Sequence, residues 1–179
     1  MLFKKNTQFR IKNHYLVLSG LILLYLVNGC KVSYSFSGAS ISPEVKTVAV
    51  LFFPNRATIV NPTLSQDFSD ALRDKIRDQT NLVFMSSSGD VNFGGEIVEY
   101  RTSPLAITGD DKAAMNRFTI GIRVKFTNVI DPEQDFEKVF SRYQDYDSSH
   151  NLSDVEEDLV VVILKQITED IFNQAFVNW

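Results

Sequence analysis

The stretch that decides the fold reads Phe118-Thr119-Ile120-Gly121-Ile122-Arg123-Val124-Lys125-Phe126. Apolar side chains alternate strictly with polar residues or glycine along it. Successive side chains of a β-strand point to opposite faces, so this alternation predicts an antiparallel strand with one face in the core. Asp131-Pro132-Glu133-Gln134 then predicts a turn, and Phe136 to Tyr146 predicts the returning strand of a hairpin.

Two more strands are predicted upstream of this hairpin. Val45 to Phe53 is β-branched and aromatic, which is typical of a buried strand. Val91 to Thr102 predicts another strand, interrupted by Gly94-Gly95. Glycines inside a strand favour a bulge or a close backbone approach. A bulge at the glycines would bring Val91 and Phe93 to the same face as Val98 and Tyr100.

Two helices are predicted from their start signals and apolar spacing. Asn61-Pro62 predicts a helix with asparagine as the cap and proline in the first position. Ser153-Asp154-Val155-Glu156 has the spacing of a capping box and predicts a long helix toward Trp179. The apolar stripe of the first helix consists of Leu64, Phe68, Ala71, Leu72 and Ile76.

The order β-α-β-β-β-α predicts an α+β two-layer sandwich with a mainly antiparallel four-stranded sheet and both helices on one face. The other face would then meet water or a partner. On the central strand that face carries Thr119, Arg123, Lys125 and Thr127. The returning strand has apolar residues of both parities, with Val139 and Tyr143 on one side and Phe136, Phe140 and Tyr146 on the other. It is therefore expected to be covered on both faces.

The amino-terminal region has the layout of a lipoprotein signal peptide. Lys4, Lys5, Arg10 and Lys12 precede an apolar run from Tyr15 to Val27, which is too short to span a hydrocarbon layer of about 30 Å. Val27-Asn28-Gly29-Cys30 resembles a bacterial lipobox, and the chain has no other cysteine. Residues 1–29 are thus predicted to be cleaved, with Cys30 as the lipidated residue. An ordinary signal peptide with an incidental cysteine is the alternative.

Beyond the signal peptide, residues 30–43 are predicted to be a lipidated, Ser- and Gly-rich tether, and residues 44–179 a single domain. The four basic residues of the signal peptide leave 14 Lys and Arg against 22 Asp and Glu, a net charge of −8. Net acidity argues against a nucleic-acid partner. By analogy with enteric sorting rules, Lys31 favours the outer membrane.

No catalytic or metal-binding pattern is found. His150 is the one histidine after the signal peptide, and no Gly-x-Ser-x-Gly elbow, phosphate-binding loop or zinc cluster accompanies it. Asp131, Glu133 and Asp135 lack the remaining ligands and the glycine of a calcium loop. The sequence therefore predicts no enzyme, no metal and no cofactor.

Three segments carry a family resemblance. They are Ala113 to Thr119, Lys125 to Asn128 and Phe140 to Tyr146. Together with the lipobox and the element order, they resemble the LPS-assembly lipoprotein, the LptE family, in its Bacteroidetes form. The resemblance implies a sandwich that sits as a plug inside the outer-membrane β-barrel LptD, assists its assembly and helps lipopolysaccharide to reach the outer leaflet. It also implies three acyl chains on Cys30, palmitate among them.

Lipopolysaccharide is anionic, and Arg and Lys bind phosphate through charge-assisted hydrogen bonds. Arg123 and Lys125 are the first candidates for that role, followed by Arg117 and Arg142. The alternative is that these residues solubilise the domain or pair with acidic residues of the barrel. The loop from Ser103 to Asn116 is expected to reach toward the extracellular side of the barrel. The alternative function is a free periplasmic lipoprotein that binds a small ligand or assists a transporter.

Overall fold

The computed structural model describes residues 41–59, 61–105 and 114–177. The signal peptide, Cys30 and most of the tether lie outside this range, as does the middle of the loop expected from Ser103 to Asn116. The described elements are β1 (Thr47–Val50), α2 (Leu64–Gln79), β2 (Val83–Met85), β3 (Val91–Pro104), β4 (Met115–Asn128), the 3-10 turn η1 (Pro132–Gln134), β5 (Phe136–Asp147) and α3 (Leu152–Phe176).

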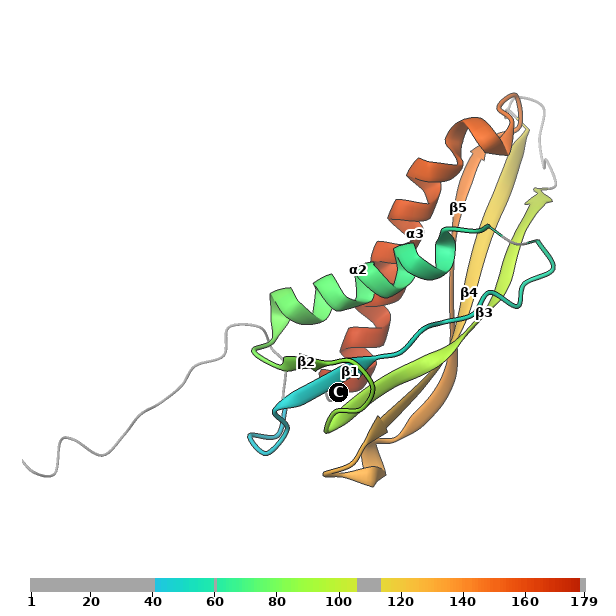
Figure 1. The fold of residues 1–179 in the computed structure, drawn as a ribbon. Helices are drawn as coiled ribbons and strands as arrows, with labels where there is room; N and C mark the ends of the chain where they lie inside the picture. Colours follow the sequence, from blue (N-terminus) through green and yellow to red (C-terminus); the bar gives the residue numbers. More distant parts are fainter. Residues whose placement is uncertain (1–40, 60, 106–113, 178–179) are drawn as a thin grey trace, which may run out of the picture. The chain divides into compact units, whose positions relative to one another are not determined.

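The sheet has five strands in the order β2-β1-β3-β4-β5 (Figure 1). β1 is parallel to both β2 and β3, whereas β3, β4 and β5 are antiparallel to one another. The predicted α+β class is confirmed, but the sheet is mixed and five-stranded rather than four-stranded. The prediction missed β2 because its three residues, Val83, Phe84 and Met85, are all apolar and show no alternation in the sequence.

The predicted alternation along β4 organises the core. Ile120, Ile122 and Val124 are fully buried on the face covered by the helices. β5 returns in continuous register, with Phe136 opposite Phe126 and Phe140 opposite Ile122. Both described helices pack on this one face, so no helix among the residues that the structure describes covers the opposite face of the sheet (Figure 1). We call that opposite side the open face.

The glycine pair in β3 makes the close backbone approach and not the bulge. Gly95 has φ +146°, and a Cβ atom there would lie 2.0 Å from the carbonyl oxygen of Arg123. The register of β3 against β4 stays regular through the glycines and shifts only between Ile97 and Glu99. Val98 is the extra residue, so the expectation that it shares the core face with Tyr100 was wrong.

α2 begins two residues later than its predicted start. The Asn61 side-chain oxygen accepts the N–H groups of Thr63 at 3.0 Å and Leu64 at 3.2 Å, so Asn61 still satisfies backbone donors at the helix entrance. Four of the five predicted stripe residues are fully buried: Leu64, Phe68, Leu72 and Ile76. Ala71 is only partly buried and faces outward along the helix layer.

The predicted capping box at the start of α3 does not form. The helix begins at Leu152, which places Ser153 inside the first turn, where its hydroxyl donates to Asp154 at 3.2 Å. Glu156 instead accepts the Tyr100 hydroxyl of β3 and the Asn61 amide, the latter at 2.7 Å. Burial and the Glu156 contact raise the pKa of Tyr100. Neither helix of the described chain is long and apolar enough to cross a membrane.

Candidate functional site

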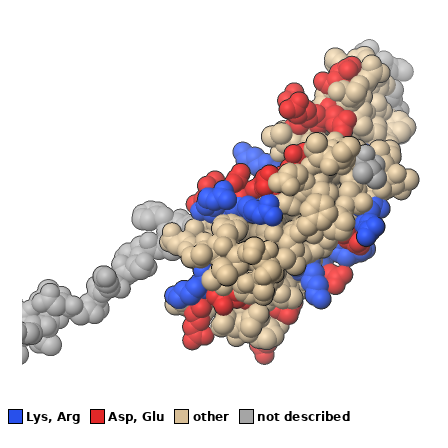
Figure 2. Space-filling model, in the orientation of Figure 1, with Lys and Arg blue, Asp and Glu red and all other residues tan. Residues whose placement is uncertain are grey.

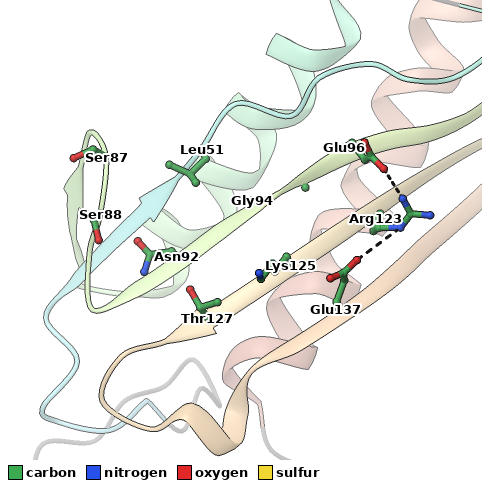
Figure 3. Close-up of a pocket in the computed structure, with 11 residues that line it drawn as sticks. Leu51, Ser87, Ser88, Asn92, Gly94, Glu96, Arg123, Lys125, Thr127 and Glu137 are labelled. Carbon is green, nitrogen blue, oxygen red and sulfur yellow. Dashed lines mark hydrogen bonds and ion pairs between the residues drawn. The ribbon is translucent and has the colours of Figure 1, made fainter.

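A groove of about 580 Å³ crosses the open face of the sheet (Figure 3). β3 and β4 form its floor, the chain after β1 and the turn after β2 form its rim, and β5 closes one side. Gly94 contributes no side chain to the floor, which leaves room beside Lys125, its partner in the register. The lining residues are Leu51, Ser87, Ser88, Asn92, Gly94, Gly95, Glu96, Arg123, Lys125, Thr127 and Glu137.

Arg123, one of the two leading candidates for phosphate binding, is held inside this groove by carboxylates. Its guanidinium donates to Glu96 of β3, and its Nε lies 4.0 Å from Glu137 of β5 (Figure 3). The register explains both contacts, because Glu96 stands directly opposite Arg123 and Glu137 is near it on the neighbouring strand. Much of the Arg123 charge is therefore balanced within the chain.

Lys125 is the cation of the groove that is available to a ligand. Its side chain is exposed, and no carboxylate of the described residues lies within 4.0 Å of it. Glu137 is its register partner on β5 but turns toward Arg123. An anion entering the groove would therefore meet an unpaired ammonium group with Arg123 beside it. This arrangement is suited to a phosphate with neighbouring hydroxyl groups.

Arg117 lies on the same face but not in the groove. It is six residues from Arg123 along β4, roughly 20 Å away. It donates two hydrogen bonds to Asp145, at 2.8 and 3.0 Å, and its guanidinium stacks on the Tyr143 ring at 3.6 Å. These hydrogen bonds hold the pKa of Asp145 below its ordinary value. Arg117 is thus a structural member of the β4–β5 pair.

Arg142 lies on the opposite face of the sheet. It pairs in the register with buried Ile120 and donates to Asp170 of α3 at 2.6 and 2.8 Å. Arg142 lies an even number of residues from Phe140 and Tyr146 on the same strand, so its side chain shares their face, the helix side. This spacing was the sequence signal that separates Arg142 from the other candidates. The structure therefore brings Arg123 and Lys125 together and keeps Arg117 and Arg142 apart from them.

A second, larger hollow of about 1060 Å³ lies along the outer surface of α2 and α3. Two lysines, Lys75 and Lys165, line it against seven carboxylates. Acidic side chains also gather over the first turns of α3 (Figure 2). This charge disfavours an anionic ligand on the helix side, despite the greater size of the hollow. The carboxylates are Asp67, Asp70, Asp74, Asp78, Glu156, Glu157 and Glu169.

Sequence reasoning placed Arg123, Lys125 and Thr127 of the groove on the open face but did not identify the residues that β3 and the turn after β2 contribute. Asn92 and Gly94 alternate with buried Val91 and Phe93 along β3, so the sequence pattern was sufficient to place them on the open face. Ser87 and Ser88 gave no such signal, because their position depends on the unpredicted pairing of β2. In the described part of the chain, no cluster of three or more His, Cys, Asp or Glu side chains is arranged to hold a metal ion.

The LptE family, described as lipopolysaccharide-assembly, matches residues 45–175. Among curated proteins, none matches the chain. A solved protein of Xanthomonas campestris is similar in structure, with TM-score 0.51 and 9% identity over 75% of this chain and 88% of that one. At that identity the likeness shows the fold alone.

Two solved lipoproteins are also similar. A minor lipoprotein of Acinetobacter baumannii has TM-score 0.47 and 11% identity over 73% of this chain and 91% of that one. A lipoprotein B of Nitrosomonas europaea has TM-score 0.47 and 13% identity over 80% of this chain and 88% of that one.

Proposed function

This chain belongs to the LptE lipopolysaccharide-assembly family, which is not enzymatic, and from that premise we propose that it is the plug and assembly partner of an LptD β-barrel. It would be anchored in the outer membrane through Cys30, with the domain entering the barrel lumen from the periplasmic side. The family match carries this proposal, because it extends over residues 45–175 and thus over nearly the whole folded domain.

The composition of the open face supports a location against another protein. Val83, Met85, Val139 and Tyr143 lie on this face and are 45% to 62% exposed. A surface facing only bulk water has no need of such a set, whereas the wall of a barrel lumen would cover it. Strand parity, and not a local distortion, places these side chains there, so they are a permanent feature of the fold.

We further propose that lipopolysaccharide phosphate binds at Lys125, with Arg123 as the second cation. The groove beside Lys125 admits a charged sugar, and hydroxyl groups line it, Thr127 on the floor and Ser87 at the rim. The acidic hollow on the helix side is electrostatically unfavourable for the same ligand. The sheet side is therefore the side that would meet lipopolysaccharide.

Affinity purification of the full chain from detergent-solubilised outer membrane tests the partnership. We expect a large β-barrel to be recovered in equal amount, and to be retained at high salt because the contact is partly apolar. Recovery of the chain alone would contradict the plug and would favour a free periplasmic lipoprotein. A Cys30→Ala variant is the control for the anchor, since it removes lipidation without touching the domain.

A further inference from the structure

β5 is an edge strand with an open side in the part of the chain that the structure describes. It is the last strand of the sheet and extends over twelve residues from Phe136 to Asp147, roughly 40 Å. Its register against β4 is continuous, with no bulge, and it contains neither proline nor glycine. Most edge strands are short or interrupted, because a long regular edge pairs readily with another strand.

The hydrogen-bond pattern shows which backbone groups face outward. At the start of β4, the carbonyl of Met115 accepts the N–H of Leu105 on the β3 side, and the carbonyl of the preceding residue, Ala114, accepts the N–H of Ser148 on the β5 side. Odd-numbered residues of β4 therefore bond to β3 and even-numbered ones to β5. The register pairs even residues with even residues, so the odd-numbered residues of β5 direct their N–H and C=O groups to the open side.

These outward backbone groups are unpaired within the described residues. None of the N–H groups from Glu137 to Asp145 donates to a loop or side chain, beyond the bonds to β4. The odd residues include Val139 and Tyr143, which are 45% and 48% exposed. The edge thus offers a row of alternating donors and acceptors, with two apolar side chains above it.

Charged side chains, which commonly guard such an edge, are drawn inward here. On the open face, Glu137 turns to Arg123 and Asp145 is bound by Arg117, both on β4. On the helix side, Lys138 contacts Gln174 at 3.4 Å and Arg142 binds Asp170, both on α3. Each of these four charges has a partner on the protein side of the strand. Lys138 meets only a neutral amide and keeps its charge on the helix side, whereas Glu137 and Asp145 on the open face are each paired with an arginine. The open face of the edge therefore lacks the electrostatic guard that its composition would suggest.

We propose that the open edge of β5 is a docking site for an extended segment of a different protein, which adds as a sixth strand and packs apolar side chains over Val139 and Tyr143. Only an extended backbone matches a row of N–H and C=O groups at the spacing of a strand. The inference goes beyond the proposed function, since it assigns the backbone edge of β5 and states what would cover Val139 and Tyr143. It does not depend on lipopolysaccharide binding at Lys125.

Residue-resolved hydrogen exchange of the full chain tests this assignment. The chain produced alone in detergent is compared with the chain in native outer-membrane vesicles. In the vesicles, protection of the Val139, Ser141 and Tyr143 amides should rise at least about 100-fold, because these amides gain hydrogen bonds. The amides of Lys138, Phe140 and Arg142 already bond to β4 and should change little.

Three results would overturn the proposal. The odd-numbered amides could stay unprotected in vesicles, which would leave the edge open. Protection that increases with concentration of the chain alone would assign the edge to a second copy. Protection in the isolated chain at every concentration would assign it to a segment of this chain.

A failure of the edge proposal can be told apart from a failure of the proposed function. If the β-barrel does not copurify but the edge amides are still protected in vesicles, the plug is rejected and the edge site is retained.

Ser141→Pro with Ser141→Ala as its matched control gives an independent readout. The Ser141 N–H points outward, so proline removes an edge donor without removing a bond to β4. Alanine removes the same hydroxyl, which donates to Glu99 at 3.2 Å, but keeps the N–H. In vesicles, we expect proline and not alanine to return the Val139 and Tyr143 amides to fast exchange. Continued protection in the proline variant would contradict strand addition.

Discussion

Gly95→Ala is expected to lower the free energy of unfolding of the domain by about 3–5 kcal/mol, a loss typical of substitutions that break a specific backbone arrangement. The new Cβ would lie 2.0 Å from the Arg123 carbonyl oxygen and 2.9 Å from the Phe53 ring. The carbonyl belongs to the β4 ladder and cannot move away without breaking strand pairing. The φ of +146° adds strain for any residue with a Cβ.

Gly94→Ala is the matched control, because it adds the same methyl group one residue earlier. There the Cβ would meet only the Leu51 side chain, at 3.4 Å, which is ordinary contact. Denaturant unfolding of both variants measures the difference, and we expect a change of less than about 1 kcal/mol for Gly94→Ala. Equal and small losses for the two variants would show that β3 and β4 do not approach as described.

Lys125→Glu is expected to weaken the binding of purified lipopolysaccharide by roughly 10- to 150-fold. A hydrogen bond to a charged group contributes about 1.5–3 kcal/mol, and that range converts to this change in Kd. The new carboxylate would also stand near Glu137 and repel the phosphate. Binding to vesicles of defined lipopolysaccharide content, measured at low and high salt, should show that the effect shrinks as salt rises.

Lys138→Glu is the matched control for charge. It makes the same change in net charge on the neighbouring strand, but its side chain lies on the helix side and contacts Gln174. We expect its binding to stay within about threefold of the unchanged chain, because only the long-range field is altered. If both variants lose binding to the same degree, net charge and not the groove determines the affinity.

Strand periodicity was sufficient to predict the central hairpin, because a buried face fixes a period of two along β4 and β5. It also placed Val139 and Tyr143 opposite Phe140 and Tyr146, as the structure confirms. The same parity would have set Arg142 apart from Arg123 had it been applied to charged residues. The face of the sheet on which a basic residue lies is thus a better predictor of a phosphate-binding role than its residue type.

The features that sequence reasoning missed depend on tertiary contacts. β2 exists because Val83 to Met85 pairs with β1, and a three-residue pattern cannot reveal such pairing. The extra residue of β3 is Val98 and not a glycine, since the glycines were needed for close approach to β4. Glu156 had the spacing of a capping residue, but Tyr100 and Asn61 compete successfully for its carboxylate.

Photocrosslinking in living cells tests most directly whether the open face of the sheet meets lipopolysaccharide. A photoreactive amino acid is placed at Thr127, beside Lys125 on the floor of the groove, or at Val161, which is 63% exposed in the acidic hollow of the helix layer. We predict lipopolysaccharide adducts from position 127 and none from position 161. Adducts from position 161 alone would contradict the assignment of the open face and would show that lipopolysaccharide contacts the helix side.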